Sequence, residues 1–279
     1  MKILKSIAVL IMFMCLPGAA TAQMEVMSYN IKYANENDGE NSWSGRKAHL
    51  TAQLNFYEPE IFGVQEAVLE QLKHFENNLE NYKYVGVGRD DGAEKGEFSA
   101  IFYKTTEFEL LKEDTFWLSE TPEKPVKGWD AALPRICTWA LFQKKDSGEK
   151  FYVFNTHFDH VGEQAREESA KLIIHKIKEI NKKGLPVILM GDLNLKPETK
   201  PIQFLSEQMN DSKKVAEKVV FGPEGTFNGY DFDKPVNDRI DYIFTNDDFR
   251  VLKYGVLSDS KDLRYPSDHL PVIVTLAIK

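Results

Sequence analysis

Short apolar segments of strand length recur along almost the whole chain, and this recurrence limits the possible fold more than any other feature. Segments of this length, separated by loops and turns, are typical of buried strands. The expected strands span residues 25–30, 60–65, 82–87, 98–104, 108–118, 136–143, 151–156, 187–190, 240–245, 251–257 and 272–278. Helices are expected between them over residues 46–57, 69–79 and 164–182. The pattern predicts an α/β protein.

Polar side chains that can ligate a metal or move a proton stand where these apolar segments stop. They are Asn30, Glu66, His157, Asp159, Asp192, Asn194, Asp241, Asp268 and His269. Each has a purely structural explanation when it is taken alone, as a turn former, a cap or a hydrogen-bonded core histidine. Their recurrence at six strand ends favours one shared site, because rigid strands hold such groups in place while loops leave room for substrate.

The chemistry of these side chains suits a hard cation. Carboxylate and amide oxygens without a cysteine partner are the ligands that Mg²⁺, Mn²⁺ or Ca²⁺ prefer. The chain lacks the close ligand spacing of a His-Glu-x-x-His zinc site, a glycine-rich phosphate loop and a Gly-x-Ser-x-Gly nucleophile motif. Metal-assisted attack of water on phosphorus is the chemistry that remains, because the residue types for a metal ligand, a base, and phosphate and leaving-group donors are all present.

These motifs make the chain resemble the endonuclease/exonuclease/phosphatase superfamily, which includes DNase I-like nucleases. Six segments carry the resemblance, in the family's order: Ser28-Tyr29-Asn30-Ile31, Val64-Gln65-Glu66, Asn155-Thr156-His157-Phe158-Asp159-His160, Gly191-Asp192-Leu193-Asn194, Arg239-Ile240-Asp241-Tyr242-Ile243 and Ser267-Asp268-His269-Leu270-Pro271-Val272. The resemblance implies a four-layer α/β sandwich. In that fold, two mixed and largely antiparallel sheets pack face to face with helices outside.

The resemblance also implies a metal site and a water site. Glu66 would bind Mg²⁺ or Mn²⁺, with Asn30 close by in contact with metal or substrate and Asp268 contributing. Asp192 would orient or deprotonate the attacking water, and Asn194 would hold the phosphate and the water.

Two histidines complete the implied site. His157 would donate a hydrogen bond to the phosphate or the leaving group, and Glu97 stands where some nucleases carry an acid that supports this histidine. His269 would contact the phosphate and be held by an acid, for which Asp241 and Asp238 are both available.

Arg135 and three tryptophans are further candidates for substrate contact. Arg135 precedes a strand and could present its guanidinium to a phosphate, or could form a surface salt bridge. Trp43, Trp117 and Trp129 could stack on a substrate or close the ends of the sandwich.

The N-terminus predicts export. Lys2 and Lys5 precede an apolar run from residue 7 to 16 and a small-residue ending at Ala22, which is the order of a signal peptide. The run is shorter than the roughly 20 residues of a membrane span, and a buried N-terminal helix is the alternative. We therefore expect a signal peptide over 1–22 and one domain over 23–279, periplasmic or secreted, without a transmembrane anchor. Only Cys137 remains there, so its core must be stable without an intrachain disulfide.

Charge and motif content limit the substrate classes. The formal charge of the chain is −8, and removal of the two signal-peptide lysines makes it −10, which argues against a tight grip on long duplex DNA. A phosphoester of a nucleic acid or nucleotide is the first expectation, a sugar or inositol phosphate the second, and a phospholipid headgroup the third. A non-catalytic binding protein and a glycan-processing protein with paired carboxylates are the alternatives from other classes. No obligate protein partner is evident.

Overall fold

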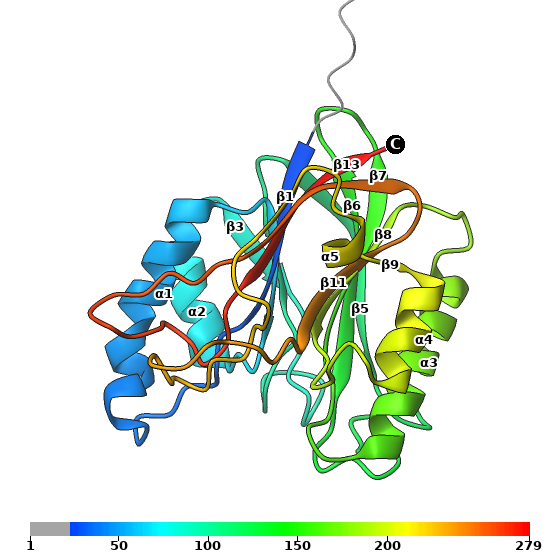
Figure 1. Cartoon of the computed structure of the whole chain (residues 1–279). Coiled ribbons are helices and arrows are strands. Elements are labelled where there is room, and N and C mark those ends of the chain that lie inside the picture. The colour runs from blue at the N-terminus through cyan, green and yellow to red at the C-terminus, as the bar shows by residue number, and fades with distance from the viewer. Residues whose placement is uncertain (1–22) are drawn as a thin grey trace, which may run out of the picture.

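Two β-sheets packed face to face form the centre of the computed structural model, which describes residues 23–279 (Figure 1). The predicted signal peptide lies outside the described residues. The first sheet has the order β10 (Val219–Phe221), β12 (Phe249–Val256), β13 (Val272–Ile278), β1 (Gln23–Asn30), β2 (Ile61–Gln65), β4 (Ile101–Lys104) and β3 (Tyr82–Val85). The second has the order β5 (Phe108–Trp117), β6 (Ile136–Lys144), β7 (Lys150–His157), β8 (Val187–Asp192), β11 (Asp241–Thr245) and β9 (Asn210–Asp211).

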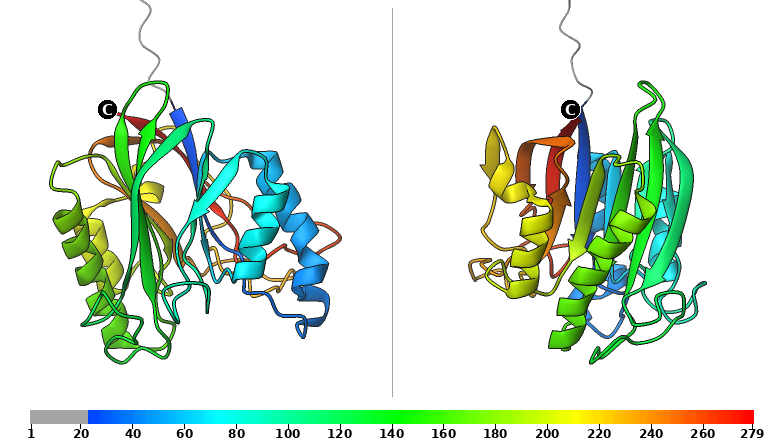
Figure 2. Two further views of the ribbon diagram at one scale, coloured as in Figure 1. Left: turned by 180° about the vertical axis from the view of Figure 1, so that it is seen from behind. Right: turned by 90° about the vertical axis from the view of Figure 1, so that its right-hand side faces the viewer.

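Helices cover the outer faces of both sheets, as the two views of Figure 2 show. On the first sheet lie α1 (Trp43–Tyr57) and α2 (Leu69–Asn78), and on the second lie α3 (Glu163–Ile180) and α4 (Lys200–Gln208). The short elements are η1 (Gly39–Asn41) and α5 (Ser212–Val215). The predicted four-layer sandwich is confirmed. No helix of residues 23–279 is long and apolar enough to cross a bilayer.

The directions of the strands bring the polar strand ends together. β1 runs parallel to β2, and β7 runs parallel to β8, so these four strands end on the same side of the sandwich. β13 is antiparallel to β1, and β11 is antiparallel to β8, so both begin on that side. The ends of six strands, three from each sheet, therefore converge there.

A buried amide network fixes the two sheets against each other. Asn155 on β7 donates to the carbonyl oxygens of Val64 at 3.0 Å and Ala100 at 2.8 Å, and accepts from Gln65 at 2.7 Å. Gly63 leaves the room for this contact, because a Cβ there would lie 2.7 Å from Cγ of Asn155. The network sets how the sheets sit against each other, and so where their ends meet.

The segment from residue 200 to 221 is the part that the strand and helix patterns did not predict. It contains α4, β9, α5 and β10. β10 is an edge strand that pairs only with β12, and all three of its side chains are exposed, so no alternation of buried and exposed residues marks it in the sequence. Trp43, one of the tryptophans considered for substrate contact, begins α1 and is buried.

Candidate functional site

A charged histidine lies between two buried carboxylates at the convergent strand ends. His269 precedes β13, and its Nδ1 lies 2.9 Å from Oδ2 of Asp241, the first residue of β11. Its Nε2 lies 3.7 Å from Asp192 Oδ2. Burial alone would lower the pKa of His269, but Asp241 and Asp192 outweigh it and raise the pKa to about 10. Asp241, not Asp238, is the acid that contacts His269, because Asp238 is half-exposed and pairs with Lys196.

Asp192 ends β8 and lies at the centre of the site. Its Oδ2 accepts from Asn30 Nδ2 at 2.9 Å, a contact that joins the two sheets, and its Oδ1 accepts from the backbone N–H of Asn194 at 2.9 Å. Burial and the nearby Asp241 raise the pKa of Asp192 to about 7. Such a carboxylate can accept a proton from water near neutral pH. Gly191 is required before it, because a Cβ there would lie 2.0 Å from the Thr156 carbonyl oxygen.

Glu66 and Asp268 form an acidic pair on the other side of Asp192. Lys32 Nζ lies 3.6 Å from Glu66 and 3.7 Å from Asp268, so one ammonium group stands between the two carboxylates. Burial raises the pKa of Asp268, and the charge of Glu66 raises it further. Asn30 donates to Glu66 at 3.1 Å, so its amide nitrogen faces that carboxylate. Two oxygen ligands that converge on one positive charge fit a hard divalent cation.

Three of these residues stand at sharp backbone turns. Lys32, Glu66 and Asn194, which follow β1, β2 and β8, have φ angles of 56°, 60° and 49°. Left-handed backbone is unfavourable for residues other than glycine and is enriched at functional sites. The side chains of all three residues line the pocket described below.

His157 differs from His269 in charge. Arg135 Nη1 donates to its Nδ1 at 3.0 Å, and because a guanidinium has no lone pair to offer, the ring proton must be on Nε2. Burial and the charges of Arg135 and Arg89 hold the pKa of His157 well below its usual range. The Nε2 atom lies 3.5 Å from Asp192 Oδ2, which can accept its proton. Asn194 Nδ2 lies 3.1 Å from Nε2, but it is itself a donor, so it makes no hydrogen bond with a protonated Nε2 and donates instead to the Phe158 carbonyl oxygen at 3.1 Å. His157 is thus a neutral hydrogen-bond donor.

Arg135 is buried, and it contacts His157 and the residues around it instead of reaching into open solvent. Only 4% of it is exposed, and it also contacts His160 Nδ1 at 3.0 Å and Asp159 at 3.3 Å. Burial would raise the pKa of Asp159, but the N–H groups of Gly162 and Val161 outweigh it and lower the pKa. Arg135 lines the pocket described below, but three side chains of this chain already occupy its donors.

Glu97 lies beside His157 but is taken by another arginine. Its carboxylate forms a two-pronged pair with Arg89, at 2.6 and 3.0 Å, whereas its distance to His157 Nδ1 is 3.9 Å. Arg135 thus contacts the histidine that Glu97 was expected to support.

An open pocket of about 430 Å³ joins these groups. Its walls are Lys32, Tyr33, Glu66, Glu97, Leu133, Arg135, His157, His160, Asp192, Asn194, Phe227, Ile240, Asp268 and His269. Asn30 and Asp241 lie behind them and orient the residues of the wall. The site therefore presents a carboxylate of raised pKa, a neutral histidine, a cationic histidine and an acidic pair to one small volume.

Several residues of this site were not predicted from the sequence. Thr226 donates to Asp241, the 40% exposed Phe227 packs edge-on against His269 with 5.1 Å between ring centroids, and Lys32 stands between the acids. Arg46 donates to the carbonyl oxygens of residues 31–33, which fixes the turn that carries Lys32. Lys32 alone had a sequence signal, because it directly follows the Ser-Tyr-Asn-Ile segment.

Comparisons with known proteins agree with this architecture. Residues 27–269 match the model of the endonuclease/exonuclease/phosphatase family. The structure of a protein of that family from Bacteroides thetaiotaomicron is 41% identical, with a TM-score of 0.90 over 93% of this chain and 99% of that one. A mannosyl-6-phosphatase from the same organism is 42% identical, with a TM-score of 0.88 over 91% of this chain and 100% of that one. An uncharacterized protein of Acanthamoeba polyphaga mimivirus is 28% identical over 259 residues, which are 83% of this chain and 91% of its own.

Proposed function

The chain belongs to the endonuclease/exonuclease/phosphatase family, and from that premise we propose that it hydrolyses a phosphoester by divalent-metal-dependent attack of water on phosphorus. One observation carries the proposal. The buried Asp192 carboxylate, with its raised pKa, has a neutral imidazole N–H at 3.5 Å and a cationic imidazole at 3.7 Å. A base flanked by two donors suits in-line displacement at phosphorus, because the base can take the proton of water while the donors stabilise the charge that develops on the phosphate.

Each residue of the site has its own role in this proposed reaction. Asp192 orients a water molecule and accepts its proton. Asn194 and the imidazolium of His269 bind the phosphate oxygens and stabilise the charge that develops on them. The Nε2–H of His157 donates to a phosphate or leaving-group oxygen. Asp241 keeps His269 protonated and fixes its ring.

Glu66 and Asp268 would hold the metal, and Asn30 would orient Glu66. When bound, Mg²⁺ or Mn²⁺ neutralises phosphate charge and polarises the P–O bond. Lys32 must then move away from the two carboxylates, which its partial exposure allows.

We further propose a phosphorylated sugar as the substrate, ahead of nucleic acid. A pocket of about 430 Å³ accommodates one sugar phosphate, and the acidic chain lacks the positive field that holds a polynucleotide. The mannosyl-6-phosphatase among the similar structures supports this order. A nucleotide is the second candidate, because the exposed ring of Phe227 could stack on a base.

A substrate panel tests the proposal with residues 23–279. The panel holds mannose 6-phosphate, p-nitrophenyl phosphate, bis-p-nitrophenyl phosphate, single- and double-stranded DNA, RNA and sphingomyelin, each with Mg²⁺, Mn²⁺ or EDTA. Turnover should require metal and should fall by at least about 10²-fold in His157→Ala and Asp192→Ala. The controls are His175→Ala and Asp146→Ala, which change exposed residues outside the pocket. Metal-independent turnover, or full activity of Asp192→Ala, would refute the mechanism.

A further inference from the structure

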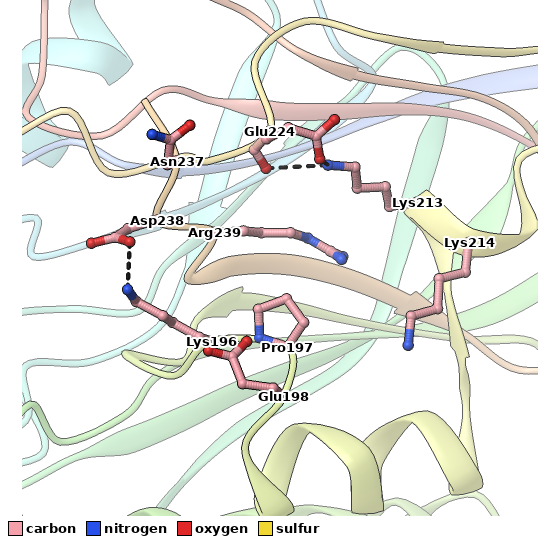
Figure 3. Close-up of a pocket in the computed structure, with 9 residues that line it drawn as sticks. All are labelled: Lys196, Pro197, Glu198, Lys213, Lys214, Glu224, Asn237, Asp238 and Arg239. Atoms are coloured by element: carbon pink, nitrogen blue, oxygen red, sulfur yellow. Dashed lines mark hydrogen bonds and ion pairs between the residues drawn. The ribbon is translucent and has the colours of Figure 1, made fainter. Parts of the chain in front are cut away.

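A second and larger cavity is lined by residues that lie close in sequence to those of the catalytic pocket. It measures about 680 Å³, and Figure 3 shows the nine residues that line it. Two chain segments line both cavities. Asn194 and Ile240 line the catalytic pocket, whereas their sequence neighbours Lys196 and Arg239 line the larger cavity. The Cα atoms of residues this close in sequence lie within about 7 Å of each other, so the two cavities share two segments of wall.

An exposed ion pair bridges the two segments at this boundary. Lys196 Nζ lies 2.6 Å from Asp238 Oδ1, and Figure 3 shows the two side chains pointing toward each other. Both side chains are about half exposed, at 50% and 49%, so the pair contributes little to stability and can open or be covered by a ligand. The backbone of Phe227 donates to Asp238, which places the exposed aromatic ring of the catalytic pocket beside this boundary.

The lining of the larger cavity carries both signs of charge in balance. Four cationic side chains face three carboxylates, and a fourth carboxylate, Asp211, lies beneath Arg239 and pairs with it at 2.9 Å. Lys213 is paired with Glu224 at 2.7 Å. A polyphosphate chain needs unpaired positive charge, and the carboxylates here would repel it. A neutral ligand with many hydroxyl groups fits better, because each hydroxyl can donate to a carboxylate and accept from a lysine.

We propose that this cavity, the distal subsite, binds the further sugar residues of an oligosaccharide whose terminal phosphate lies at Asp192. The inference rests on the proposed function and deepens it: the preferred substrate is a phosphorylated oligosaccharide and not a free sugar phosphate. Glu198 and Lys214 are the residues to change, because both line the subsite, both are exposed and neither belongs to the catalytic pocket.

The test compares mannose 6-phosphate with a trimannoside that carries the same phosphate on its non-reducing end. We expect the wild-type KM for the trimannoside to be about tenfold lower, with a similar kcat, because a few added hydrogen bonds give about that gain. The double variant Glu198→Ala/Lys214→Ala should lose this preference and keep its kinetics on mannose 6-phosphate. The matched control Glu80→Ala/Lys182→Ala changes the same residue types at exposed positions outside both cavities.

Each contrary outcome has its own meaning. Equal KM values in the wild type, or a preference that survives the double variant, would overturn the subsite while mannose 6-phosphate turnover upholds the proposed function. A preference for a 5′-phosphorylated trinucleotide that the double variant loses would make the subsite a nucleic-acid site instead. If neither sugar phosphate is hydrolysed, the proposed substrate fails. Calorimetry then measures the binding of phosphate-free trimannoside, which does not depend on turnover. Weaker binding by the double variant than by the wild type would support the distal subsite, and equal binding would overturn it.

Discussion

At the scale of single residues, the two histidines are chemically unlike because their partners are unlike. His269 contacts a carboxylate and is held protonated, whereas His157 contacts a guanidinium and is held neutral. The same residue type therefore supplies a positive charge on one side of Asp192 and an uncharged donor on the other. Arg135 and Asp241, which set this difference, are positioning residues.

Arg135→Met tests this assignment. Removing the guanidinium should raise the pKa of His157 toward the ordinary value of about 6.5, because one of the charges that disfavour the imidazolium is lost. In the wild type, the imidazole ring of His157 should stay neutral, with its proton on Nε2, as the pH falls past about 6.5. Nitrogen-15 NMR of the histidine rings, assigned with His157→Gln, measures both properties. Arg250→Met, at an exposed arginine outside the pocket, should leave the titration unchanged. An unaltered titration in Arg135→Met would refute the assignment.

Glu66→Gln tests the metal site. The loss of one ligand charge should raise the Mg²⁺ concentration for half-maximal activity by at least about tenfold. Calorimetric Mn²⁺ binding to the metal-free protein gives a readout that does not depend on turnover. Glu97→Gln is the control, because this acid lines the same pocket but pairs with Arg89. A metal requirement shifted equally by both variants would place the ion elsewhere.

At the scale of elements, the packing of the sheets decides where the site residues meet. Asn155→Ala removes three buried hydrogen bonds that connect the sheets, and we expect it to lower the free energy of unfolding by about 2–4 kcal/mol. Asn55→Ala, on the exposed face of α1, should change it by at most about 0.5 kcal/mol. Urea denaturation measures both. A small effect of Asn155→Ala would mean that apolar packing alone holds the sheets together.

The elements also show how far the sequence predicts this protein. Strands such as β2 and β8 were predictable because they are wholly buried and therefore wholly apolar up to their polar ends. β10 was not, because an exposed edge strand has no such pattern. In the site, Asp192 and His269 stand in recognisable segments, but the contact between Arg135 and His157 joins positions 22 residues apart through side-chain direction, which sequence spacing does not encode.

At the scale of the whole molecule, we propose that the chain is exported and cleaved after Ala22. The basic start at Lys2 and Lys5, the apolar run over 7–16 and the small residues that end at Ala22 support this proposal. Gln23 pairs with Ala277 of β13, so residue 23 belongs to the sheet and is kept in the proposed mature protein. Fractionation of the native host should find the protein outside the cytoplasm, with an N-terminus at Gln23 by sequencing. Replacing two leucines of the apolar run, Leu10→Asp and Leu16→Asp, should retain it inside. An uncleaved N-terminus on the exported protein would refute the cleavage site.

The hydrogen bond between Asn30 and Asp192 has a consequence for when activity begins. It joins the end of β1 in one sheet to the end of β8 in the other, so neither sheet alone contains a working site. On the proposed function, hydrolysis would begin only once both sheets have docked, so the onset of turnover would report that docking.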